Sequence, residues 1–278
     1  MSAISDKYAE LGGGNSVLGN PTSAEADTAV DGGRYRHDQN GSIFSHKNTG
    51  AHEVHGRIHE KWGKIKAERG PLGFPTSDES DCNGVPDSKY NLFERGSITW
   101  KQGADEAFET HGAIRDKFCD MGCEAGTLGF PTTDESPCGD KKGRFNHFEN
   151  GSIYWKPSIG THEVHGLIRN YWRDNNWEYN PDLGYPISDE TLPHGDSQDR
   201  FSDFENGVVY WKHGTPAAFS FQKLPVSADG KGSQTADMVV PGIKQLVRDQ
   251  LKKWRFRSWT PCPGVHRKVL SKILPERA

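Results

Sequence analysis

Pairs of histidines are the first residues in this chain whose type and spacing could support chemistry. Two His-Glu-Val-His segments, His52 to His55 and His162 to His165, place imidazoles three positions apart, and two such imidazoles could hold a metal ion on one face of a turn. The intervening copy begins with Phe108, and zincin metal sites space their histidines four apart. We therefore predict no metal site and expect these histidines to hydrogen-bond the neighbouring hairpin.

Adjacent carboxylates are the second candidates for chemistry. They stand at Asp78-Glu79, Asp134-Glu135 and Asp189-Glu190. Acid–base or glycosidase catalysis needs one asymmetric site, whereas these pairs recur at a regular interval, so we interpret them as turn residues. No nucleophile elbow, phosphate-binding loop or dinucleotide fingerprint is present, so the sequence predicts no catalytic residue and no cofactor.

These residues are organised by a motif that occurs four times. It begins at Leu18, Leu72, Leu128 and Leu183, and reads Leu-Gly-aromatic-Pro in the last three copies. Gly-Ser-Ile segments and His-Gly pairs keep the same interval of about 55 residues, so whole units are repeated. The first copy lacks the aromatic residue, and terminal repeats are often atypical in this way.

Each unit contains the signals of a helix followed by a hairpin. We expect the helix to start around a His-Gly pair with apolar residues at i and i+4, as at Val54, Ile58 and Trp62. The hairpin signal is strongest at Asn150-Gly151. The sequence therefore predicts an α+β repeat protein of four helix-plus-β-hairpin units in a pseudo-symmetric array, with a helical C-terminal appendage.

The predicted domains are a repeat array at 1–221 and a basic linker and helical tail at 222–278. The units divide the array at about 1–55, 56–111, 112–165 and 166–221. Residues 241–278 hold ten Lys or Arg against two acidic residues, which leaves a formal charge of −12 for residues 1–240 out of the total of −4. We expect the basic tail to pack on the acidic array rather than to bind nucleic acid or a membrane surface.

The five cysteines and the N-terminal residues indicate the cellular compartment of the protein. An odd number of cysteines favours free thiols over a complete disulfide framework. The chain opens without the apolar core of a signal peptide and holds no run long enough to span a membrane. We predict a cytoplasmic protein from the sequence as it stands, or an extracellular or cell-wall-associated one if a signal has been removed.

Three motifs together resemble the LGFP repeat family. They are Leu-Gly-Phe-Pro, the strand Gly-Ser-Ile-Tyr-Trp and the link Gly-Thr-His-Glu-Val-His-Gly, and the resemblance covers residues 1 to about 215. Members of this family are modules on actinobacterial cell-wall enzymes, such as mycolyltransferases and peptidoglycan amidases, and similar repeats occur in fungal proteins. The resemblance implies units packed like short propeller blades in a closed array, and binding to wall polysaccharide.

We therefore predict that the chain is a non-catalytic, lectin-like module whose equivalent weak sites bind a glycan or cell-wall polysaccharide with avidity. Strand parity places Tyr154 and Tyr210, with Phe44 in the first copy, opposite the face of Ile153 and Val209. On that face they could stack on a sugar ring, unless neighbouring units bury them. The predicted ligand-facing residues are Tyr154, Tyr210, His162, His165, His52, His55 and Phe44.

Two other functions fit the same sequence. An enzyme, for example one of secondary metabolism, would use a central or inter-unit pocket and would break the repeat at one place with a unique set of residues. A protein-interaction scaffold would expose a large apolar patch. The sequence leaves these alternatives open.

Overall fold

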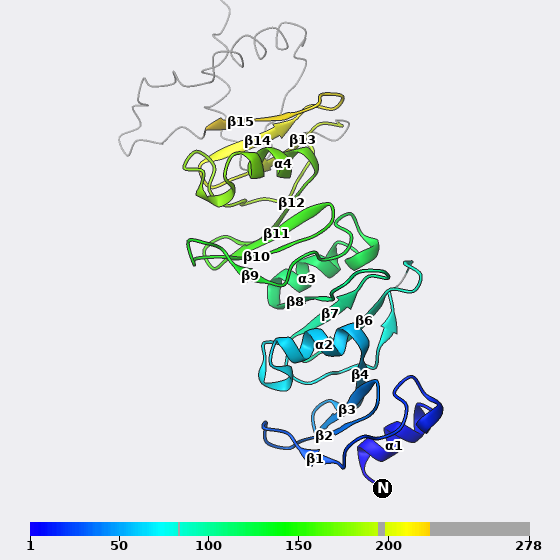
Figure 1. The fold of residues 1–278 in the computed structure, drawn as a ribbon. Helices are drawn as coiled ribbons and strands as arrows, with labels where there is room; N and C mark the ends of the chain where they lie inside the picture. Colours follow the sequence, from blue (N-terminus) through cyan, green and yellow to red (C-terminus); the bar gives the residue numbers. More distant parts are fainter. Residues whose placement is uncertain (83, 194–197, 223–278) are drawn as a thin grey trace, which may run out of the picture. The chain divides into compact units, whose positions relative to one another are not determined.

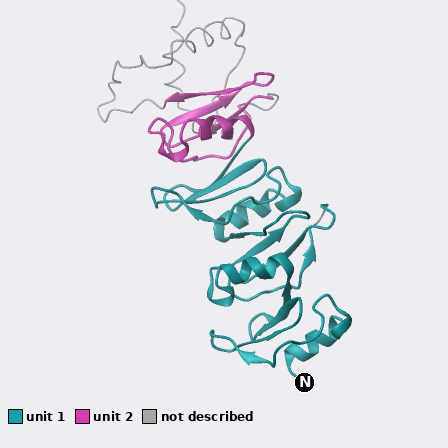
Figure 2. Cartoon of the chain, viewed as in Figure 1, with its two compact units in different colours: residues 1–165 teal, residues 166–278 magenta. Residues whose placement is uncertain are grey.

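The computed structural model describes residues 1–82, 84–193 and 198–222 (Figure 1). The chain forms two compact units, residues 1–165 and residues 166–278 (Figure 2). The first unit holds three repeats and the second begins with a fourth. The predicted basic tail lies outside the described residues from position 223 onward. Among the described residues, no helix is long and apolar enough to cross a bilayer.

The first two repeats each run from an α-helix through a short 3-10 helix into a four-stranded antiparallel sheet. The first consists of α1 (Ala3–Glu10), η1 (Gly13–Asn15), β1 (Ala26–Asp27), β2 (Gly33–His37), β3 (Gly41–His46) and β4 (Gly50–His55). The second consists of α2 (Gly56–Lys64), η2 (Ala67–Arg69), β5 (Ser80–Asp81), β6 (Lys89–Phe93), β7 (Gly96–Trp100) and β8 (Phe108–His111).

The other two repeats follow the same order. The third consists of α3 (Gly112–Asp120), η3 (Cys123–Ala125), β9 (Ser136–Pro137), β10 (Arg144–His147), β11 (Gly151–Lys156) and β12 (Gly160–His165). The fourth consists of α4 (Gly166–Asp174), η4 (Trp177–Tyr179), β13 (Arg200–Asp203), β14 (Gly207–Trp211) and β15 (Ala218–Gln222). The predicted α+β repeat architecture of four units is therefore confirmed.

Each sheet is open, with its strands side by side in sequence order. The predicted closure of the array, by contrast, is not found: the described residues form no closed barrel or propeller. The expected hairpin at Asn150-Gly151 is present, because β10 and β11 pair with Asn146 opposite Ile153. The predicted helix start at the His-Gly pair is confirmed, but Val54 does not belong to the helix. Val54 lies in β4, and α2 begins at Gly56, so His-Glu-Val-His is a strand.

The cores lie between helix and sheet, and one of them joins the first repeat to the second. One cluster combines Phe44 and Val54 of the first repeat with Ile58, Trp62 and Ile98 of the second. On the central strands the predicted core face is confirmed, since Ile98, Ile153 and Val209 are fully buried. The cluster that contains Phe44 joins the first repeat to the second, whereas Ile114, Phe118 and Ile153 belong to a separate cluster within the third repeat.

The Leu-Gly-Phe-Pro motif is a turn held by the helix before it and the hairpin after it. Gly73 has a φ of 77°, in the region that favours glycine, and a Cβ there would collide with the Glu94 carboxylate. That carboxylate accepts the Phe74 backbone N–H at 3.0 Å, and the Trp62 indole N–H donates to the Gly73 carbonyl at 3.2 Å. Tyr8 and Trp172 make the equivalent bond to the motif glycine in the first and fourth repeats.

Candidate functional site

The His-Glu-Val-His segment of β4 belongs to a hydrogen-bond network that joins the first repeat to the second. Asp78 Oδ1 accepts the Glu53 backbone N–H at 3.1 Å and lies 3.2 Å from His52 Nδ1. His55 lies between two glutamates, with Nδ1 2.7 Å from Glu53 Oε2 and Nε2 3.2 Å from Glu79 Oε1. Burial opposes the charge on His55, but the two carboxylates outweigh burial and raise its pKa to about 9. His55 is therefore a charged bridge between the repeats at neutral pH.

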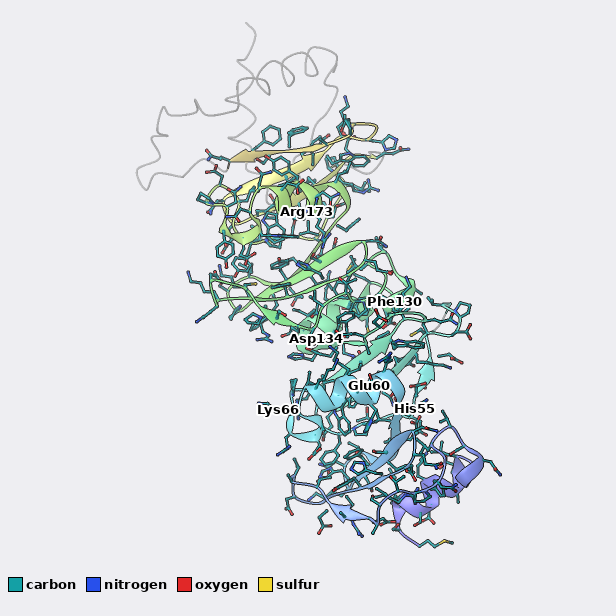
Figure 3. The ribbon with its side chains drawn as sticks, viewed as in Figure 1. His55, Glu60, Lys66, Phe130, Asp134 and Arg173 are labelled. Carbon is teal, nitrogen blue, oxygen red and sulfur yellow. The ribbon has the colours of Figure 1, made fainter. Side chains whose placement is uncertain are left out.

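The junction between the second and third repeats has the same design. Asp134, labelled in Figure 3, accepts the Glu109 backbone N–H at 3.1 Å, and Glu109 Oε1 accepts the Glu135 backbone N–H at 3.0 Å. His111 again lies between the two glutamates, 2.8 Å from Glu109 Oε2 and 3.3 Å from Glu135 Oε1. At both junctions the paired carboxylates hold neighbouring repeats together, which agrees with their interpretation as structural residues.

Two of the predicted aromatic platforms are buried. Phe44 is 6% exposed and packs edge-on against Trp62 with ring centroids 4.5 Å apart. Tyr154 is 3% exposed and stacks on Phe145 at 5.3 Å. Neither offers an open ring face to a sugar. Tyr210 is half-buried, and its hydroxyl donates to Asp199, so only this ring keeps part of its surface in water.

The predicted ligand-facing histidines are occupied by the protein itself. In the first repeat, His52 Nε2 lies 2.8 Å from the Thr49 carbonyl in addition to its contact with Asp78. In the third repeat, His162 Nε2 lies 3.0 Å from the Ile159 carbonyl, and His165 Nδ1 lies 2.8 Å from Glu163 Oε2. No group of three or more metal-ligating side chains occurs in the part of the chain that the structure describes.

The structure brings together a different set of residues, in a pocket of about 470 Å³ between the β2–β3 hairpin and the start of α2. We call it the His59 pocket. It is lined by Thr22, His37, Asp38, Gln39, Asn40, Gly41, Ser42, Gly56, His59 and Glu60. Figure 3 labels Glu60, on the first turns of α2, and His55, at the end of β4. Apart from the two glycines, every lining residue has a polar side chain.

A buried serine links two imidazoles that line this pocket. His37 and Ser42 are cross-strand partners on β2 and β3, which brings His37 Nδ1 within 2.7 Å of Ser42 Oγ. His59, one turn into α2, places Nε2 3.2 Å from the same oxygen. A hydroxyl has one proton, so Ser42 can donate to only one imidazole and must accept from the other. Ser42 itself is fully buried.

His59 breaks the pattern of the repeats. Arg115 and Arg169 stand at the same position of α3 and α4, three residues after the first glycine of the helix. In the second repeat Arg115 Nε donates to Ser97 Oγ at 3.1 Å, so a guanidinium contacts the serine that corresponds to Ser42. The histidine side chain is shorter than the arginine side chain. Histidine at this position therefore leaves room beside the serine.

Asp38 is the second departure. The other repeats carry a buried phenylalanine at this position, as at Phe93 and Phe148. Arg36 Nη2 and Nε donate to Asp38 Oδ1 at 2.7 and 3.2 Å, and the guanidinium lies 4.2 Å from the centre of the Tyr8 ring. The other carboxylate oxygen is buried and has no hydrogen-bond partner among the described residues. Burial outweighs the nearby Arg36 and raises the pKa of Asp38.

The periodicity of the sequence does not reveal this site, because the residues that distinguish it do not recur. The informative positions are those where one repeat carries a different residue from the others. Histidine in place of arginine at position 59 and aspartate in place of phenylalanine at position 38 are both visible once the four units are superposed in sequence. That they line one pocket follows only from the fold.

Comparison with known proteins gives one strong match. A family model described as LGFP repeat matches residues 18–70, 72–126, 128–179 and 183–223, which together exceed half of the chain. No curated protein matches the chain. Eight solved chains match in structure.

Two of the structural matches are plant proteins. The hemopexin fold protein CP4 from cow pea is 10% identical, with 74% of this chain and 93% of that chain covered and a TM-score of 0.18. The 2S albumin seed protein from Dolichos is 8% identical, with 74% and 94% covered and a TM-score of 0.18. At these TM-scores neither similarity defines the fold.

Proposed function

Because the chain belongs to the LGFP repeat family, we propose that it is a non-catalytic carbohydrate-binding protein whose first repeat holds a ligand in the His59 pocket. The observation that supports this proposal is the lining of the pocket, in which hydroxyl, amide, imidazole and carboxylate side chains line an open depression of about 470 Å³. The proposed ligand is a wall polysaccharide, and the proposed location of the protein is outside the cell or on its wall.

The hydrogen-bonding capacity of the lining suits a ligand rich in hydroxyl groups. Within the described part of the chain, the Thr22 hydroxyl makes no hydrogen bond, and Gln39 and Asn40 each use only one end of their amide. Gln39 Oε1 accepts the Asn20 backbone N–H, which leaves its amide nitrogen as a donor. Asn40 Nδ2 donates to the Val17 carbonyl, which leaves its oxygen as an acceptor. Sugar hydroxyls both donate and accept, so they can match such a mixture.

The same pocket favours binding over covalent catalysis. Ser42 is the one hydroxyl held by imidazoles, as a nucleophile would be, but its side chain is fully buried and cannot reach a substrate. The carboxylate of Glu60 is 2.8 Å from Arg57 Nη1, and that of Asp38 is bound by Arg36, so both pocket carboxylates already have a cationic partner. Tyr210, half-buried in the fourth repeat, stays a candidate for a second ligand contact.

The proposal is tested by binding to a glycan array and to insoluble wall polysaccharides. The informative variant is His59→Arg, which installs the residue of the third and fourth helices and is therefore compatible with the fold. Lys64→Arg, at the far end of α2, is the matched control because Lys64 is exposed and lies outside the pocket.

We expect saturable binding that His59→Arg abolishes and Lys64→Arg retains. Absence of binding by the unmodified protein to every glycan would reject carbohydrate binding. Equal binding by His59→Arg would reject the pocket as its site.

A further inference from the structure

Ser42 contacts both imidazoles of the His59 pocket, so the proton positions on the two rings depend on each other. When both rings are neutral, one ring N–H donates to Ser42 Oγ, and the Ser42 hydroxyl donates to the unprotonated nitrogen of the other ring, across 2.7 and 3.2 Å. The second nitrogen of one ring is then an acceptor, and that of the other ring is a donor. When one proton is added to the second nitrogen that was an acceptor, both second nitrogens become donors, and the two hydrogen bonds of Ser42 stay as they were.

The charges around His59 decide when that proton is added. Burial comes first and opposes a charge on the ring, and the histidines at positions 37 and 55 oppose it further, so the pKa of His59 is lowered. Glu60 on α2 and Glu53 on β4 act in the other direction but are weaker. Since the pKa of His55 is about 9, a positive charge persists beside His59 at neutral pH.

The pocket has no free carboxylate to balance an added proton. Glu60 is paired with Arg57 and Asp38 with Arg36. In the second repeat the corresponding serine faces Arg115, a charge that does not titrate in the accessible pH range. The first repeat thus has a titratable group where the second has a permanent cation.

We propose that the His37–Ser42–His59 chain makes ligand selection at this pocket pH-dependent, favouring a neutral sugar when both imidazoles are neutral and an acidic sugar when the pair is protonated. The inference rests on the proposed carbohydrate binding. A protonated pair, in which both second nitrogens carry an N–H group, attracts the carboxylate of a hexuronate, because Glu60 and Asp38 are already paired with arginines. The neutral pair offers one donor and one acceptor, which suits a hydroxyl group of a neutral hexose.

The test compares two probes that differ only at C6, D-glucose and D-glucuronate. Their dissociation constants are measured by NMR titration of the full chain at about pH 7.5 and about pH 5, where glucuronate stays ionised. The ratio of the two constants removes general effects of pH on the protein. His59→Gln, which keeps a hydrogen-bond donor but cannot titrate, is compared with Lys64→Arg as the matched control.

We expect the preference for glucuronate over glucose to rise about two- to fivefold at the lower pH, the range for a partly exposed ion pair. His59→Gln should lose this change, and Lys64→Arg should keep it. A ratio that is independent of pH, or that changes equally in His59→Gln, overturns the inference and leaves carbohydrate binding intact. Failure of glucuronate to bind at about pH 5 also overturns it. Failure of every glycan on the array, by contrast, removes the proposed function itself.

Discussion

Replacing His55 by glutamine should remove a pH-dependent contribution to the stability of the junction between the first two repeats. His55 contacts Glu53 Oε2 at 2.7 Å and Glu79 Oε1 at 3.2 Å, and 17% of its side chain is exposed. These contacts raise its pKa from 6.5 to about 9 in the folded protein. At about 1.4 kcal/mol for each tenfold change in proton affinity, the charged contacts contribute about 3 kcal/mol.

The raised pKa fixes the direction of the pH dependence. Below pH 6.5 the imidazole is protonated in both the folded and the unfolded chain, so the whole contribution is present. Between pH 6.5 and about 9 the unfolded chain releases its proton while the folded chain retains it, and the contribution falls. Above about 9 it is lost. The free energy of unfolding should therefore decrease as the pH rises through this window.

Urea denaturation followed by tryptophan fluorescence measures this effect at about pH 6 and about pH 9.5. The unmodified chain should lose about 3 kcal/mol more than His55→Gln between the two pH values. His213→Gln, in which an exposed histidine is replaced, is the control and should behave as the unmodified chain. If His55→Gln retains the full pH dependence of the unmodified chain, the proposed role of the two glutamates is refuted.

Four further variants test the packing argument by urea denaturation. Arg36→Ala should destabilise by about 3 kcal/mol because it leaves the buried Asp38 unpaired, whereas Arg36→Asn with Asp38→Phe, the pair found in the second and third repeats, should be neutral or stabilising. Trp62→Phe should cost about 1 kcal/mol or more, since it removes the hydrogen bond to the Gly73 carbonyl. Gly129→Ala should cost about 1 to 3 kcal/mol, because φ is 70° there and the new methyl group meets the Glu149 carboxylate.

The repeat, the hairpins and the core face could be predicted from the sequence because each depends on local or periodic signals. Asn150-Gly151 fixes a turn by itself, and Ile98 and Ile153 lie on the buried face that strand alternation assigns to them. Strand alternation, however, does not predict whether the opposite face of the sheet is exposed to solvent. In the second repeat that face carries Thr99, which is 4% exposed and donates to Glu124 in η3 of the following repeat. In the third repeat, Tyr154 on the corresponding face is 3% exposed and out of reach of a ligand.

The junction network could not be predicted because its partners lie in different repeats. Asp78 and Glu79 have the sequence signature of a turn, and their bonds to Glu53 and His55 depend on the stacking of the second repeat on β4. The His59 pocket was hidden for a related reason. Its lining comes from a hairpin of one repeat and the helix of the next, and only the fold brings His37 and His59 to the same serine.

Each position at which one repeat differs from the others therefore needs its own explanation. Ala24 stands where the later motifs carry Asp78 and Asp134, and residues 1–17 form α1 and η1 rather than a strand that could bind an aspartate. Ser220 in β15 stands where β4 and β8 carry Glu53 and Glu109, the residues that bind the following repeat.

His59 has no such explanation. It belongs to α2, whose Ile58 and Trp62 form one cluster with residues of the first and the second repeats, so the loss of arginine does not follow from a lack of packing partners. A change at an internal junction that opens a polar pocket and places an imidazole on a buried serine calls for a cause other than packing. Ligand binding provides one, and His59→Arg separates the two: a packing role predicts altered stability, whereas a binding role predicts a folded chain that no longer holds its ligand.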